Sequence, residues 1–169
     1  MNRTLQLNAL VFAIGLASAS SITSAADGIV RHPIPGSDFP ISAAVEIPAG
    51  KSTVYLSGMV PPIADKDAPK GSVASYGNTE VQTVAVLKRI QEQLVRLKLG
   101  MGDVVKMQVY LVGDPDNDNK LDFAGFMKGY TKFFGTTEQP KLPVRSAFQI
   151  AALAGPGMLV EIEVTAVRP

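Results

Sequence analysis

The sequence has no cysteine and a single histidine, and these two absences exclude several kinds of active site. Without cysteine there can be neither disulfides nor thiol nucleophiles. His32 alone cannot build a zinc site with several histidines, and its place ahead of Pro33 near the N-terminus does not favour a catalytic triad. No glycine-rich phosphate loop or dinucleotide fingerprint occurs either. Chemistry is therefore left to carboxylates, arginine, hydroxyls, backbone groups and water, and no cofactor is expected.

An excess of either charge is also absent. The chain has 16 lysines and arginines against 15 aspartates and glutamates, a formal net charge of +1, with no run of like charges. Because neutralisation of phosphates dominates the affinity of nucleic-acid-binding proteins, a neutral chain of this kind argues against a nucleic-acid partner.

The one long apolar run lies at the N-terminus. Residues 1–26 contain an early cation, Arg3, then an apolar stretch over residues 5–17, then small residues that suit cleavage before Asp27 or one residue earlier. This pattern predicts a cleaved signal peptide and a periplasmic or secreted protein. The alternative is a membrane anchor, but the stretch is shorter than the ~20 residues that span a bilayer. The remaining residues, 27–169, suit a single domain.

Within that domain the apolar pattern alternates between strand and helix periods. A helix is expected to begin at Thr79, with Gln82 at capping-box spacing, and to stop at Gly100. A second amphipathic helix follows at residues 123–134. Strands are expected at residues 52–60, 103–112, 145–153 and 158–167, with a further short strand before the first. The order β-β-α-β-α-β-β predicts an α+β domain with both helices on one face of a mixed sheet.

The stretch DPDNDNKLD resembles part of a calcium-binding loop. Asp114, Asp116, Asp118 and Asp122 fall at the first, third, fifth and ninth positions of such a loop, but its glycine and its bidentate glutamate are missing. A solvated turn whose aspartates cap the second helix fits the same residues and is favoured.

The last two apolar runs carry charge where buried strands normally have none. Period-2 alternation puts Arg145 on one face with Ala147, and Glu161 on one face with Glu163. Each strand is therefore expected to have an apolar face for the core and a polar face. The polar faces could meet only solvent, with Arg145 in a weak surface ion pair, or they could form a site.

The same residues carry a resemblance to a known family. LPVRSAFQIAALAGPGMLVEIEVTAV is similar to the C-terminal signature of the Rid (YjgF/L-PSP) family of reactive-intermediate deaminases, and VYLSG, GDVVKMQVYL and YTKFFG are similar to its earlier elements. The resemblance implies a chorismate-mutase-like fold and a homotrimer with ligand pockets between subunits. It also implies hydrolysis of imines or enamines, such as 2-iminobutanoate and 2-iminopropanoate, to a keto acid and ammonia.

Carried over by position, the resemblance assigns Arg145 to the substrate carboxylate and Glu161 to the attacking water. It places Gly58 and the adjacent Ser57 in the wall of the pocket. Four positions depart from the family, which has a tyrosine, a glutamine, an asparagine and, in some members, a cysteine where this chain has Ile41, Met59, Met127 and Ala147. These apolar replacements indicate a bulkier or more apolar ligand, or weak activity.

The two charged strands are expected to pair as a hairpin around the turn at residues 154–157. Aligning their polar faces sets Glu161 beside Gln149 or Ala151, roughly 14–20 Å along the strands from Arg145. If both residues serve one small substrate, they must then come from different subunits.

Three functions remain open at this stage. The first is an exported imine or enamine deaminase, which would meet other substrates than a cytosolic member does. The second is a binding protein for small carboxylates that keeps the arginine and turns nothing over. The third is a ribonuclease, against which the neutral charge argues.

Overall fold

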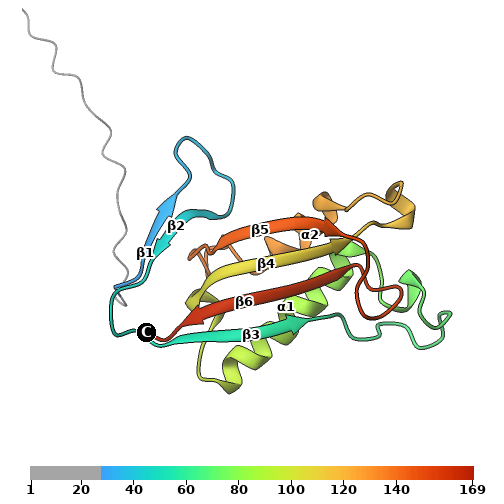
Figure 1. Cartoon of the computed structure of the whole chain (residues 1–169), viewed down its shortest axis with the longest axis horizontal. Coiled ribbons are helices and arrows are strands. Elements are labelled where there is room, and N and C mark those ends of the chain that lie inside the picture. Colours follow the sequence, from blue (N-terminus) through green and yellow to red (C-terminus); the bar gives the residue numbers. More distant parts are fainter. Residues whose placement is uncertain (1–27) are drawn as a thin grey trace, which may run out of the picture.

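The computed structural model describes residues 28–169, so the predicted signal peptide lies outside the described residues. The described chain begins with a hairpin of two strands, and four more strands and two α-helices follow (Figure 1). The elements are β1 (Val30–Pro33), β2 (Ser42–Glu46), β3 (Thr53–Met59), α1 (Thr79–Arg96), β4 (Val104–Val112), α2 (Phe123–Tyr130), β5 (Val144–Ile150) and β6 (Val160–Val167).

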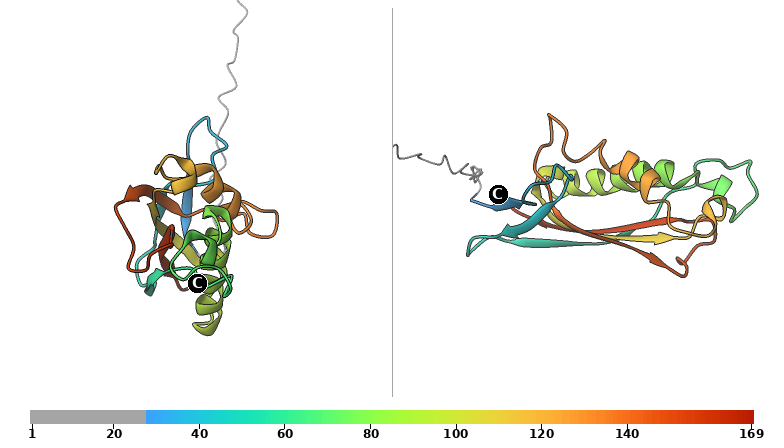
Figure 2. Two further views of the ribbon diagram at one scale, coloured as in Figure 1. Left: turned by 90° about the vertical axis from the view of Figure 1, so that its right-hand side faces the viewer. Right: turned by 90° about the horizontal axis from the view of Figure 1, so that it is seen from above.

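The main sheet has the strand order β3-β6-β4-β5. β4 runs parallel to β5 and antiparallel to β6, and β6 runs antiparallel to β3, so the sheet is mixed. Both helices cover the same face of this sheet and leave the other face open (Figure 2). The predicted α+β architecture is confirmed, with one addition: β1 and β2 form a separate two-stranded sheet.

The core lies between the main sheet and the helices. Alternate residues of β4 and β6 point into it, as period 2 requires, and the helices contribute residues at helical spacing. The fully buried side chains at its centre include Met107, Val109, Leu111, Ile162, Leu87, Ile90, Leu94, Phe126 and Tyr130. None of the helices in residues 28–169 has the length and apolar character that a bilayer crossing requires.

The start of α1 differs from the predicted capping box. Asn78 is the N-cap, and its side chain accepts a hydrogen bond from the backbone N–H of Val81. The fully buried amide of Gln82 instead donates to the carbonyl of Gly157 and accepts from the N–H of Leu159 at 2.7 Å. Gln82 therefore fixes the turn that leads into β6. The helix also ends earlier than predicted, at Arg96.

The aspartates of the DPDNDNKLD stretch are dispersed rather than gathered around a common centre. Asp114 accepts from the N–H of Asp116, and Asp122 caps α2 by accepting from the N–H of Gly125. Across residues 28–169, no three acidic, histidine or cysteine side chains are grouped so that they could hold a metal ion. The cap that Asp122 forms on α2 agrees with the interpretation as a capping turn.

The predicted hairpin of the last two strands is wrong. β4 lies between β5 and β6, so the turn at residues 154–157 carries the chain across β4 instead of folding it back onto β5. β4 is largely buried and takes an inner place in the sheet, where both of its edges are paired. Strands that follow one another in sequence are neighbours in only about two thirds of cases.

Candidate functional site

Arg145 lies on the face of the sheet that the helices cover. It pairs in register with Met107, whose side chain is fully buried beneath the helices. Its guanidinium carbon is 4.3 Å from the ring centroid of Tyr130 and 4.9 Å from that of Phe126, both on α2. Two further rings, those of Phe39 and Phe123, have centroids at 5.4 and 5.9 Å. Four aromatic rings thus surround the cation and interact with it through their π faces.

Hydrogen bonding to this guanidinium is incomplete. Its buried Nη1 atom has no hydrogen-bond partner among the described residues, and none of the ion pairs formed within residues 28–169 involves Arg145. Burial lowers the pKa of Arg145, an effect that the oxygen of Tyr130 partly opposes. The side chain still remains charged, because arginine titrates far above neutral pH. A partly buried cation without an acidic partner among the described residues is suited to binding an anion from outside.

The segment that precedes β2 is held against this cation. The hydroxyl of Tyr130 donates to the carbonyl of Pro40 at 2.8 Å, and the hydroxyl of Ser42 donates to the carbonyl of Leu142 at 2.7 Å. As a result, Ile41 and Arg145 line the same depression, of about 300 Å³, which Ala43, Lys106 and Ser146 also border. Of the predicted ligand-contacting residues, Ile41 therefore lies close to Arg145.

Met127 and Ala147 belong to the same side of the molecule. Ala147 lies two residues beyond Arg145 on the same face of β5, and Met127 lies on α2. Both are partly buried against the core, where each contributes packing.

Glu161 lies on the opposite, open face of the sheet. It pairs with Tyr110 of β4, whereas the neighbouring core residues Val160 and Ile162 point toward the helices. Its carboxylate lies against Gly58 of β3, so closely that a Cβ atom at that position would overlap Oε1 of Glu161. A glycine is therefore required at position 58 for the carboxylate to take this position.

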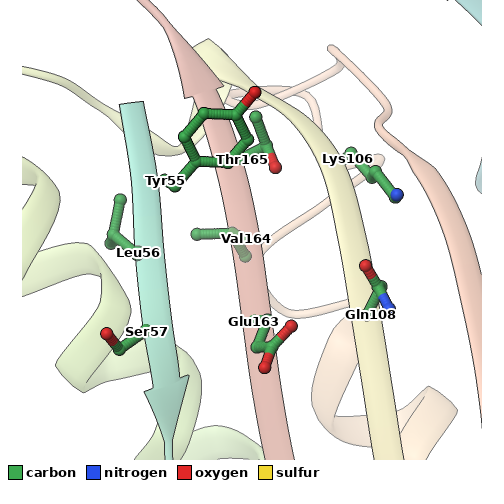
Figure 3. A pocket seen from close by; sticks show the side chains of 8 residues that line it. All are labelled: Tyr55, Leu56, Ser57, Lys106, Gln108, Glu163, Val164 and Thr165. Carbon is green, nitrogen blue, oxygen red and sulfur yellow. The ribbon is translucent and has the colours of Figure 1, made fainter. Parts of the chain in front are cut away.

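Ser57 lies on the same open face, in a shallow depression of about 320 Å³ (Figure 3). Three neighbouring strands supply its polar lining: β3 gives Tyr55 and Ser57, β4 gives Lys106 and Gln108, and β6 gives Glu163 and Thr165.

Tyr110 joins this group. Its hydroxyl donates to Glu163 at 3.2 Å and accepts from Gln108 at 3.3 Å. Burial raises the pKa of Tyr110, and the hydrogen bond to Glu163 raises it further. Sequence reasoning missed Lys106, Gln108 and Tyr110, although their alternation with the buried residues of β4 is the signal that places them on one face.

The predicted residues therefore form two groups that a single chain does not bring together. The first, which we call the arginine half-site, comprises Arg145, Ile41, Met127 and Ala147. The second, the glutamate half-site, comprises Glu161, Gly58 and Ser57. Their charged members are separated by two strand spacings and three residues along β4, roughly 14 Å between Cα atoms. Because three is an odd number, their side chains also leave opposite faces of the sheet.

The structure therefore corrects the prediction that the polar faces of β5 and β6 are aligned. It is Phe148, rather than Arg145, that β5 presents on the open face, where it is 42% exposed and contacts Tyr110 edge to face. Met59, the remaining departure from the family pattern, packs against the core at the end of β3.

This chain is similar to proteins of one family in both sequence and fold. The profile of the family described as Endoribonuclease L-PSP matches residues 35–168. A RutC family protein from Leuconostoc mesenteroides subsp. cremoris is 30% identical over 117 residues, which cover 69% of this chain and 81% of the relative.

Solved structures with a similar fold include two that are 26% and 27% identical in sequence. A Rid-family protein from Yersinia pestis is 26% identical with a TM-score of 0.57. The match covers 77% of this chain and 88% of the Yersinia protein. TdcF from E. coli, solved with bound serine, is 27% identical with a TM-score of 0.54. The match covers 73% of this chain and 85% of TdcF.

Proposed function

The chain belongs to the Endoribonuclease L-PSP (Rid/YjgF) family, and from this premise and the two half-sites we propose that it is an exported imine or enamine deaminase whose sites lie between subunits of a homotrimer. Arg145 binds the carboxylate of a small 2-imino acid, and Glu161 of a neighbouring subunit positions the attacking water. The observation that carries this proposal is the division of the site residues. Arg145 shares a depression with Ile41, and Glu161 lies against Gly58, yet the two charged residues lie on opposite faces of one sheet.

The chemistry needs only groups that the two half-sites contain. The guanidinium of Arg145 donates two parallel hydrogen bonds to the substrate carboxylate. Glu161 accepts a proton from water, whose oxygen forms a bond to the imine carbon while the electron pair of the C=N bond moves to nitrogen. Transfer of that proton from Glu161 to nitrogen gives the carbinolamine. Its C–N bond then breaks as the hydroxyl proton passes to nitrogen, which releases ammonia and leaves a 2-oxo acid. An enamine enters the same sequence after protonation at carbon gives the imine.

The proposal of a carboxylate ligand also agrees with the ligand of a solved relative. TdcF from E. coli holds serine, an amino acid with a free carboxylate. The environment of Arg145 supports the same class of ligand, because a single arginine among four aromatic rings suits one small anion better than the phosphates of RNA. The ribonuclease that the family description mentions is therefore the less favoured activity.

The alternative is a binding protein that holds small carboxylates without turning them over. The apolar side chains at Ile41 and Met127 favour this alternative, because they offer no polar contact to a reacting amine. Turnover separates the two proposals. A binding protein should bind 2-oxobutanoate through Arg145 and release no ammonia from 2-iminobutanoate.

Complementation between two inactive variants tests the shared site. Arg145→Ala and Glu161→Gln should each be inactive, because each removes one half-site. When the two are unfolded together and refolded, some clefts receive an intact Arg145 from one chain and an intact Glu161 from another. Part of the deaminase activity should then return, measured as ammonia released from 2-iminobutanoate generated in situ.

Glu163→Gln provides the matched control, since Glu163 lies two residues farther along the same face. It should keep most of the activity alone. If wild type is active but no activity returns in mixed oligomers verified by native mass spectrometry, the two residues do not share a cleft.

A further inference from the structure

Two exposed phenylalanines flank the guanidinium of Arg145 and are not needed to fill the core. Phe39 and Phe123 are each 39% exposed, and their rings stack with centroids 6.4 Å apart and planes inclined by 15°. We call this pair the aromatic ledge. Large aromatic side chains are normally buried, and a stacked pair that stays exposed beside a cation calls for an explanation.

The ledge is fixed in place rather than attached to a free loop. The N–H of Phe39 donates to the hydroxyl of Ser37 at 3.1 Å, and the carbonyl of the next residue, Pro40, accepts from Tyr130. Phe123 is the first residue of α2 and its ring packs against that of Phe126, with centroids 6.0 Å apart. Both rings are therefore held before any ligand arrives, and binding against them orders little additional structure.

We propose that the aromatic ledge selects carboxylates that carry an aromatic or similarly large apolar group. The inference rests on the proposed function, in which Arg145 binds the carboxylate. Because the guanidinium lies 5.4 and 5.9 Å from the two ring centroids, a ligand whose carboxylate is bound there has its side group within reach of the rings. A phenyl group placed on them gains both apolar burial and the favourable geometry of an aromatic pair. The apolar side chain of Ile41, in the same depression as Arg145, suits the same ligands.

A matched pair of ligands tests the selectivity. 2-Oxobutanoate and 2-oxo-4-phenylbutanoate have the same head group and differ by one phenyl ring. Isothermal titration of protein purified from cells that express the full chain should give a Kd at least about tenfold lower for the phenyl compound. In Phe39→Ala the ratio of the two Kd values should fall to about threefold or less.

Phe148→Ala is the matched control, because Phe148 is a phenylalanine of similar exposure on the open face of the sheet. It should keep the tenfold preference. Phe39→Leu, which keeps an apolar side chain without the ring, should give an intermediate preference. A ratio of two affinities is insensitive to a modest loss of folded protein, since that loss affects both ligands alike.

The outcomes separate this inference from the proposed function. If wild type binds both acids through Arg145 with equal affinity, or if Phe39→Ala keeps the tenfold preference, the ledge does not select the ligand and only the inference is overturned. If Arg145→Ala binds both acids as tightly as wild type, the assignment of Arg145 to the carboxylate is wrong, and the inference falls with it.

Discussion

Substitution of Gly58 by alanine displaces the Glu161 carboxylate without removing it. The Cβ of alanine would occupy the place of Oε1 of Glu161 and would lie only 2.8 Å from its Cδ. Because these atoms form the end of a flexible side chain, Glu161 can rotate away, at a cost of ~0.5–1.5 kcal/mol for a strained or less favourable rotamer. Replacing a glycine inside a strand by alanine stabilises the folded state by ~0.5–1 kcal/mol. The free energy of unfolding should therefore change by less than ~1 kcal/mol, and the melting temperature by only a few degrees.

Activity should respond far more strongly than stability. A positioned general base contributes a factor of ~10²–10⁴ to the rate, so a displaced Glu161 should lower kcat by about 100-fold or more. The assay measures ammonia release from 2-iminobutanoate, together with the melting temperature of each variant. Gly100→Ala is the matched control, because a Cβ there meets its nearest neighbour only at 4.0 Å and the backbone has φ −125°. It should leave both quantities unchanged.

A double variant shows whether Gly58 acts through Glu161 or by blocking the substrate. If the methyl group acts only by moving the carboxylate, Gly58→Ala should add little to the defect of Glu161→Gln, because the two changes remove the same contribution. Wild-type turnover in a folded Gly58→Ala protein would refute the assignment of this carboxylate to the water. A double variant much slower than Glu161→Gln would show instead that the glycine is needed for ligand access.

Three further predictions concern other parts of the chain. Arg145→Ala should weaken the binding of 2-oxobutanoate by ~2–4 kcal/mol in titration calorimetry, and Arg145→Lys should not restore it, because lysine lacks the planar fork; unchanged affinity in either variant would contradict the assignment. Burial raises the pKa of Tyr130 to about 12. Its stabilising contribution is therefore present below pH ~10 and is lost as the pH rises from ~10 to ~12, by about 3 kcal/mol. Denaturant titrations should show this loss in wild type and its absence in Tyr130→Phe. The mature protein should begin at Asp27 or Ala26 and be found outside the cytoplasm, and intact-mass measurement of a full-length cytosolic species would contradict that expectation.

Periodicity was sufficient to predict the main elements of the fold. β4 alternates so strictly between Met107, Val109 and Leu111 and the polar residues between them that its existence and its buried face follow from sequence alone. The order of strands in the sheet did not follow. A Gly-Pro-Gly turn between two apolar runs favours a hairpin locally, but burying both edges of β4 stabilises the domain more than one tight turn does.

The face on which Arg145 lies could not be predicted from the strand itself. Alternation gave the correct set of residues for each face of β5 but the wrong assignment of those faces to core and solvent. A cation facing the core is unfavourable unless other groups stabilise its charge. Here those groups are aromatic rings of α2 and of Phe39, which lies more than 100 residues earlier in the chain. Such compensation depends on the tertiary structure and leaves no trace in the local pattern.

This arrangement strengthens the case for a site shared between chains, although the hairpin that first suggested it is absent. With β4 between them, Arg145 and Glu161 are separated laterally as well as along the strands, and they point to opposite faces. No rotamer change within one chain can bring a carboxylate on the open face to a guanidinium beneath α2, because the sheet itself lies between them. A neighbouring copy can do so if its open face packs against the edge of β5. Tyr55, which is 80% exposed, supplies aromatic surface on that open face. The same contact would cover this ring and complete the site, so loss of the oligomer should abolish turnover even when every residue of both half-sites is intact.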